Sequence, residues 1–94
     1  MYRVFVTYET APDPGRYAQH VELCEKVPNA VFRHGPVKRT LFGDELGYYA
    51  EFEFADSETF KAAAASEEFA ATGKDAEEMG YPHSVYVADV SQPS

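Results

Sequence analysis

His20 is the side chain in this sequence best suited to chemistry. At about 100° per residue, a helix over residues 14–27 places Tyr17, His20, Cys24 and Val27 on one face. His20 is the only polar side chain near the middle of that face, and an imidazole exchanges a proton near neutral pH. We therefore expect it to point toward the sheet. It is either a general acid or base for a ligand, or a core histidine bonded to a backbone carbonyl or a tyrosine hydroxyl.

The other two histidines do not complete a metal site. His34 lies in a predicted strand beside Gly35, where a bulge can turn its side chain to the rim of a pocket, and we include it among the ligand-binding residues. His83 begins the last predicted strand and is expected to be exposed. Zinc sites need close spacing such as His-x-x-x-His, so we predict no metal. Cys24, the single cysteine, is expected to be a small core residue.

Three tyrosines can form pocket walls around His20. Tyr17 precedes His20 by about one helical turn, and strand alternation puts Tyr8 and Tyr48 on the side of the sheet that faces the helices. A phenol provides an apolar wall with a polar tip, which suits an aromatic or polyketide-like ligand, although tyrosine is also a common strand residue. The sequence has no phosphate loop, dinucleotide fingerprint or Ser-His-Asp order, and we predict no cofactor.

The charge of the chain limits its partners. Sixteen acidic residues against eight basic ones give a net charge of −8, which repels nucleic acid and anionic membranes alike. The sequence lacks an apolar run long enough to cross a bilayer and shows no signal segment before its first strand, so a cytoplasmic location is expected. An uncharged, hydrophobic organic compound is the ligand class that fits best.

Residues 1–94 are predicted to form a single α+β domain with the order βαββαβ. Alternating apolar residues and turn signals predict strands over residues 2–9, 30–42, 48–54 and 83–90, and helices over 14–27 and 57–79. Asp13 is the expected cap of the first helix, and Ser66 is expected to break the second. This order is typical of the ferredoxin-like fold, a four-stranded antiparallel sheet with the helices on one face. The tail at residues 91–94 is expected to fray.

The sheet face away from the helices should bind a second copy of the chain. Phe5, Tyr49 and Tyr86 fall on it by alternation, and such a face is too apolar to leave in water on a domain of this size. A homodimer that packs sheet to sheet would cover it by two-fold symmetry. Glu51 and Glu53 share this face, and we interpret them as interfacial or solvated rather than catalytic.

Residues 20–29 resemble the first helix of the EthD-like family of dimeric α/β barrel proteins, which carries a His-x-Pro-Leu-x-x-Lys-x-Pro-Gly pattern. His20, Leu23, Lys26 and Pro28 match in register, whereas Glu22 and Asn29 replace the family proline and glycine. Residues 64–68 together with Asp75 are similar to the family's second-helix region, where Ser-Pro-Glu and a later Asp are usual.

The resemblance implies sheet-to-sheet dimers with a cleft between sheet and helices in each subunit. It also implies relatives such as cofactor-independent monooxygenases, lactone isomerases and polyketide cyclases. Three hypotheses follow for this chain, the third of them an assembly module whose main function is its sheet interface. The first is a cofactor-free enzyme acting on a hydrophobic oxygenated compound, with His20 moving a proton. The second is a non-catalytic protein that binds or delivers such a compound in an oxidation system, with His20 structural.

Overall fold

Four strands and three helices make up the chain in the computed structural model, which describes residues 1–91. In chain order they are β1 (Tyr2–Tyr8), α1 (Pro14–Cys24), β2 (Val31–Pro36), β3 (Tyr48–Phe54), α2 (Ser57–Ala64), α3 (Glu67–Met79) and β4 (His83–Asp89). The predicted frayed tail lies almost wholly in residues 92–94, outside the described part.

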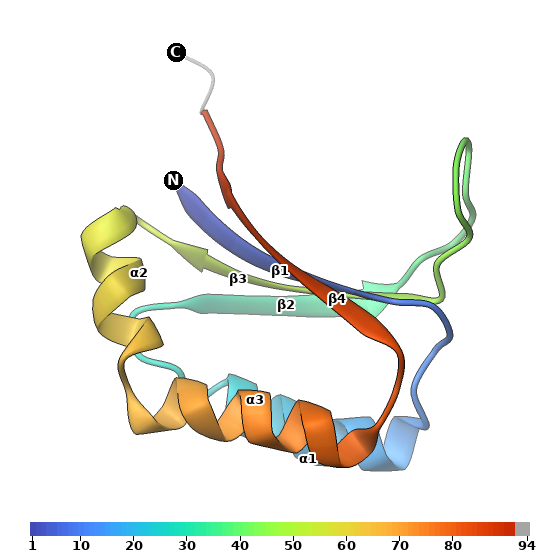
Figure 1. The fold of residues 1–94 in the computed structure, drawn as a ribbon, viewed down its shortest axis with the longest axis horizontal. Coiled ribbons are helices and arrows are strands. Elements are labelled where there is room, and N and C mark those ends of the chain that lie inside the picture. The colour runs from blue at the N-terminus through green and yellow to red at the C-terminus, as the bar shows by residue number, and fades with distance from the viewer. Residues whose placement is uncertain (92–94) are drawn as a thin grey trace.

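The strands form one antiparallel sheet in the order β2-β3-β1-β4, and all the helices lie on one of its faces (Figure 1). This confirms the predicted ferredoxin-like βαββαβ architecture. The register places Val4 opposite Phe52 and Val87, and Tyr8 opposite Tyr48 and His83. All of these side chains therefore share the face that the helices cover.

Side-chain caps set the start of each helix. The Asp13 carboxylate accepts a hydrogen bond from the Arg16 amide at 2.9 Å, and Asp56 does the same for Thr59 at 2.8 Å. Ser66 caps α3 by accepting from the Phe69 amide, which confirms the predicted break between α2 and α3. Gly80 ends α3 in the left-handed conformation, with φ of 73°.

The predicted strand over residues 30–42 is wrong in its second half, because β2 ends at Pro36. The following loop returns through Gly47, whose amide donates to the Tyr8 carbonyl at 2.8 Å. A Cβ at Gly47 would collide with the backbone of Thr10, so only glycine allows this close approach. Leu41 and Phe42 extended the apolar pattern in the sequence, yet both are exposed in the loop.

The core fills the space between the sheet and the helices. It is built from Val4, Cys24, Val27, Phe52, Phe54 and Ala63, with Phe32, Phe60 and Phe69 packed around them. The predicted core position of Cys24 is confirmed. Burial raises the pKa of its thiol to about 12, so the thiolate needed for nucleophilic chemistry is absent at neutral pH.

Candidate functional site

His20 is held by a carboxylate from the neighbouring helix. Its side chain leaves α1 on the buried face, and only 5% of the residue is exposed. The His20 Nδ1 atom lies 2.8 Å from Oδ2 of Asp75 on α3. The Arg16 guanidinium, one turn earlier on α1, donates to both oxygens of the same carboxylate, at 2.6 Å to Oδ1 and 3.2 Å to Oδ2. Asp75 thus links α1 to α3 at the level of His20.

These contacts fix the protonation pattern of the imidazole. The hydrogen bonds from Arg16, followed by that from His20, hold the pKa of the Asp75 carboxyl below its usual value, so Asp75 is a carboxylate at neutral pH. A carboxylate only accepts hydrogen bonds, and Nδ1 of His20 must therefore carry the hydrogen. The remaining ring nitrogen, Nε2, is left to exchange a proton. This is the arrangement that a carboxylate imposes on the histidine of a catalytic triad.

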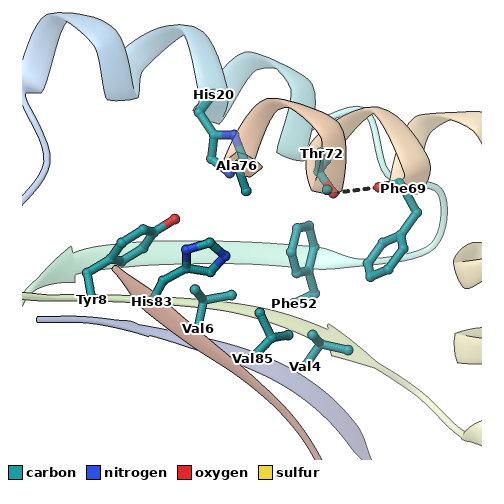
Figure 2. Close-up of a pocket in the computed structure, with 11 residues that line it drawn as sticks. Val4, Val6, Tyr8, His20, Phe52, Phe69, Thr72, Ala76, His83 and Val85 are labelled. Carbon is teal, nitrogen blue, oxygen red and sulfur yellow. Dashed lines mark hydrogen bonds between the residues drawn. The ribbon is translucent and has the colours of Figure 1, made fainter. Parts of the chain in front are cut away.

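A cavity of about 130 Å³ lies beside His20, between the sheet and the helices. Figure 2 shows its walls: the imidazole of His20 projects down from α1, α3 forms the rest of the roof, and the side chains of β1, β3 and β4 form the floor. Most of the lining side chains are apolar, and Tyr8 and His83 are the polar groups of the floor. The lining residues are Val4, Val6, Tyr8, His20, Phe52, Phe69, Thr72, Gly73, Ala76, His83 and Val85.

Tyr8 supplies a neutral phenol to this cavity. It is 2% exposed, and its hydroxyl points up from the sheet toward the helices (Figure 2). Burial raises the pKa of Tyr8 above its ordinary value, so the phenol keeps its proton across the neutral range and can donate a hydrogen bond. The only hydroxyl besides that of Tyr8 in the lining is on Thr72, and it donates to the Phe69 carbonyl at 2.7 Å within α3.

His83 is a site residue that sequence reasoning missed. We expected it to be exposed, but it is partly buried and lines the cavity from β4. Its ring centroid lies 5.7 Å from that of Tyr8, its partner across the β1–β4 pairing. The signal was present in the strand pattern, because His83 precedes Val85 by two residues and therefore shares its face.

Three of the predicted ligand-binding residues lie in a neighbouring hollow instead. Tyr17, His34 and Tyr48 line a groove of about 260 Å³ between α1 and the β2–β3 edge, and Nδ1 of His34 is 2.7 Å from the Tyr48 hydroxyl. The Tyr17 ring, which lines the groove, lies 5.0 Å from that of Tyr48 and 5.8 Å from that of Tyr8 between ring centroids. Of the five predicted residues, His20 and Tyr8 thus share the cavity.

The opposite face of the sheet carries aromatic rings and paired charges. Phe5 stacks against Tyr86 at 5.1 Å and against Tyr49 at 6.2 Å, as the predicted alternation requires. Glu51 and Glu53 also lie here, but their side chains are only 12% and 19% exposed and are not freely solvated. Two arginines and a tyrosine bind them: Arg3 to Glu53 at 2.7 Å, Arg33 to Glu51 at 2.8 Å, and the Tyr49 hydroxyl to Glu51 at 2.8 Å.

Residues 1–91 hold no cluster of three or more histidine, cysteine or acidic side chains placed to bind a metal ion. None of the helices in that part of the chain combines the length and the apolar character needed to span a membrane.

Solved structures share this fold over nearly the whole chain. An EthD (ethyl tert-butyl ether D) family protein from Bacillus halodurans C-125 is 19% identical, with a TM-score of 0.80 over 97% of this chain and 99% of that one. A dimeric ferredoxin-like protein of unknown function from Jannaschia sp. CCS1 is 17% identical, with a TM-score of 0.73 over 95% and 98%. SnoaB, a cofactor-independent oxygenase from Streptomyces nogalater, is 18% identical in its N63A mutant form, with a TM-score of 0.60 over 98% and 95%.

Sequence comparison adds nothing to these structural matches. No protein-family model matches the chain, and the search of curated proteins found no similar sequence. At identities below one fifth, likeness to solved structures speaks for the fold and not for a shared activity. The fold implied by the EthD-like resemblance is therefore confirmed, and this chain shares its ferredoxin-like fold with an EthD family protein and with a dimeric protein of unknown function.

Proposed function

We propose that this protein is a cofactor-independent enzyme that moves a proton on a small, hydrophobic, oxygenated compound of about one ring. One observation carries the proposal: a buried imidazole, oriented by a carboxylate at 2.8 Å, lines an apolar cavity. Desolvated histidine–carboxylate pairs of this kind are a common form of general base.

The size and lining of the cavity define the ligand class. A volume of about 130 Å³ is close to that of a cavity of roughly 150 Å³ that accepts benzene in an engineered protein. Two fused rings would need more space than that. Most of the lining is aliphatic or aromatic, and the polar groups within reach are His20, His83 and Tyr8. A single six-membered ring bearing a carbonyl or hydroxyl group satisfies both conditions.

Each polar group has a distinct task in this proposal. Nε2 of His20 removes a proton from carbon next to the ligand carbonyl, and the Asp75 carboxylate stabilises the imidazolium that forms. The Tyr8 phenol, which stays protonated, donates a hydrogen bond to the enolate oxygen as charge develops there. Asp75 is a positioning residue, since it reaches the ligand only through His20.

Proteins with the same fold are consistent with this chemistry. SnoaB is a cofactor-independent oxygenase, and another similar structure is of an antibiotic biosynthesis monooxygenase. Removal of a proton without a cofactor is a step that His20 and Tyr8 can carry out unaided. Oxidation would in addition require a substrate able to pass an electron to oxygen by itself.

We further propose that the protein is a homodimer joined through the outer sheet face. The stacked rings of Phe5, Tyr49 and Tyr86 give this face an apolar centre, and the Arg–Glu pairs beside it remove the charge that would otherwise oppose association. Similar structures of this fold are described as dimeric. The interface leaves the cavity of each subunit on the other side of the sheet.

Hydrogen–deuterium exchange on cyclohexanone tests the enzymatic proposal. In D₂O at neutral pH, the wild-type protein is expected to accelerate loss of the α-proton signals, followed by ¹H NMR. His20→Gln should reduce the acceleration by roughly 100-fold, the usual contribution of a positioned general base. Glu22→Gln on the exposed side of α1 is the matched control and should leave the rate unchanged.

Two outcomes would count against the enzyme. If His20→Gln exchanges cyclohexanone as fast as wild type, His20 is not the base. If wild type binds cyclohexanone, seen as line broadening of the ligand signals, but never accelerates exchange, the protein is a non-catalytic carrier of such compounds.

A further inference from the structure

His83 occupies the cavity wall opposite His20. It begins β4, and its Nδ1 atom lies 2.7 Å from the backbone carbonyl oxygen of Tyr81. In Figure 2 the imidazole of His83 lies at the level of the sheet, whereas that of His20 descends from the helical layer above it. A ligand in the cavity is therefore flanked by two imidazoles, one from each layer of the fold.

The hydrogen bond to Tyr81 determines which nitrogen of His83 can react. A carbonyl oxygen only accepts, so Nδ1 of His83 carries its hydrogen whether the ring is neutral or charged. The same argument holds for Nδ1 of His20 and the Asp75 carboxylate. Within residues 1–91 neither Nε2 atom has a hydrogen-bond partner. Both histidines thus keep Nε2 for proton exchange.

Two such groups on opposite walls allow more than exchange at one carbon. A single base most readily returns a proton to the position from which it came. A second group on the far wall can deliver a proton to a different atom of the same ligand, and the ligand then leaves as an isomer.

We propose that His83 is a second catalytic residue, the acid partner of His20, and that the substrate class is a one-ring unsaturated ketone whose double bond shifts by proton relocation. This inference rests on the proposed function of the cavity. Nε2 of His20 takes a proton from the α carbon: the C–H bond breaks, an N–H bond forms, and the electron pair moves into a dienolate. The imidazolium of His83 then gives its Nε2 proton to the γ carbon, and the carbonyl re-forms with the double bond conjugated.

The surroundings of the two histidines suit this division of tasks. His20 is buried beside a carboxylate, which stabilises the positive charge that a base acquires. His83 is less buried and stands beside Val85, which is 56% exposed on the edge strand, so solvent reaches this end of the cavity. After each turnover His20 holds the extra proton and His83 lacks one, and exchange with water restores both. The reaction consumes no oxidant or reductant.

Isomerisation of 3-cyclohexen-1-one to 2-cyclohexen-1-one, followed by the ultraviolet absorbance of the conjugated product, tests the role of His83. Wild type should accelerate the reaction, and His83→Gln should lower the rate by roughly 100-fold. Exchange of cyclohexanone protons needs only the base, so His83→Gln should lower the rate of isomerisation at least tenfold more than it lowers the rate of exchange. Ser84→Ala, on the other face of β4, is the matched control.

The outcomes separate this inference from the proposed function. Unchanged isomerisation in His83→Gln, or no isomerisation by wild type despite exchange of cyclohexanone, overturns the role of His83 and leaves that of His20 intact. Absence of both reactions in wild type overturns the two together. Long-range ¹H–¹⁵N spectra provide a substrate-free readout: neutral His83 should be protonated on Nδ1, and a neutral form protonated on Nε2 contradicts the proposal.

Discussion

Asp75→Asn is the substitution that most directly probes the site, because it keeps the shape of the side chain and removes its charge. In the wild type, Oδ2 of Asp75 lies 2.8 Å from Nδ1 of His20 and 3.2 Å from the Arg16 guanidinium, and Oδ1 lies 2.6 Å from the same guanidinium. An amide offers one acceptor where the carboxylate offers two. If its nitrogen faces His20, Nδ1 must accept, and the hydrogen moves to Nε2, the atom facing the cavity.

The stability cost can be estimated from the two partners. The Arg16 side chain is 29% exposed, so solvent screens its pair with Asp75 and that pair adds little to stability. The bond to the buried His20 is charge-assisted and contributes about 1.5–3 kcal/mol. Because the amide retains part of each interaction, we expect a loss of about 2 kcal/mol in the free energy of unfolding. For a domain of this size that corresponds to a fall of about 8–16 °C in Tm.

The charge of Asp75 also predicts a dependence on pH. Its folded-state pKa is depressed, so its stabilising effect is present above the unfolded carboxyl pKa and is lost as the pH falls through the folded value. The difference in urea midpoint between wild type and Asp75→Asn should therefore be full at pH 7 and shrink below about pH 4.

Urea denaturation and ¹⁵N-resolved imidazole spectra measure both effects. The expected result is a less stable protein in which His20 changes tautomer and the exchange of cyclohexanone protons is lost. The reasoning is refuted if the variant unfolds at the wild-type urea concentration at pH 7. It is equally refuted if His20 keeps its hydrogen on Nδ1 while activity disappears.

Three further predictions concern other parts of the fold. Gly47→Ala should lower the free energy of unfolding by about 3 kcal/mol, because the added methyl collides with the backbone. Gly73→Ala in α3 should raise the free energy of unfolding by about 1 kcal/mol, because the added methyl meets open space there. Thermal unfolding of the two variants tests both signs, and equal shifts in Tm contradict the argument. Tyr86→Glu should place a charge in the proposed interface and halve the mass seen by sedimentation, without abolishing exchange of cyclohexanone; an unchanged mass argues against that interface. Because burial raises the pKa of Cys24 to about 12, its thiol should react with Ellman's reagent at pH 8 only after unfolding in urea, and rapid reaction of the native protein rules out the buried position.

The fold could be predicted from the sequence because the spacing of apolar residues and the residues that begin and end helices indicated the same elements. Alternation in β1 and β3 identified which residues face the helices, and the Asp13 and Ser66 caps marked two helix starts. The prediction failed where apolar residues that continue a strand pattern have nothing to pack against in the folded chain. Leu41 and Phe42 continue a strand-like pattern, but the chain has already left the sheet at Pro36 to bring Gly47 against Tyr8.

The site was predictable only in part, because the order of residues in the chain does not tell which helices pack together or which strands pair. His20 could be placed by helical period alone. The role of Asp75 depends on how α3 packs against α1, and that of His83 depends on the pairing of β4 with β1. Tyr17, Tyr48 and His34, which were grouped with His20 in the prediction, line the neighbouring groove, although the Tyr17 ring lies 5.5 Å from that of His20 between centroids. Residues on one face of the sheet or helix can still line different hollows, because the packing of the side chains between them is set by the tertiary fold.

The distribution of charge joins the site to the proposed interface. Three of the arginines are committed to carboxylates, Arg16 above the cavity and Arg3 and Arg33 on the outer sheet face. The net charge of −8 must therefore be carried elsewhere, and exposed glutamates of the helices, such as Glu22 and Glu77, carry part of it. Anionic molecules are repelled at long range, while the cavity itself holds a proton-transfer pair in an apolar lining. This combination favours neutral ligands. In the proposed reaction such a ligand becomes negatively charged only when its proton passes to His20, and Tyr8 then stabilises the negative oxygen.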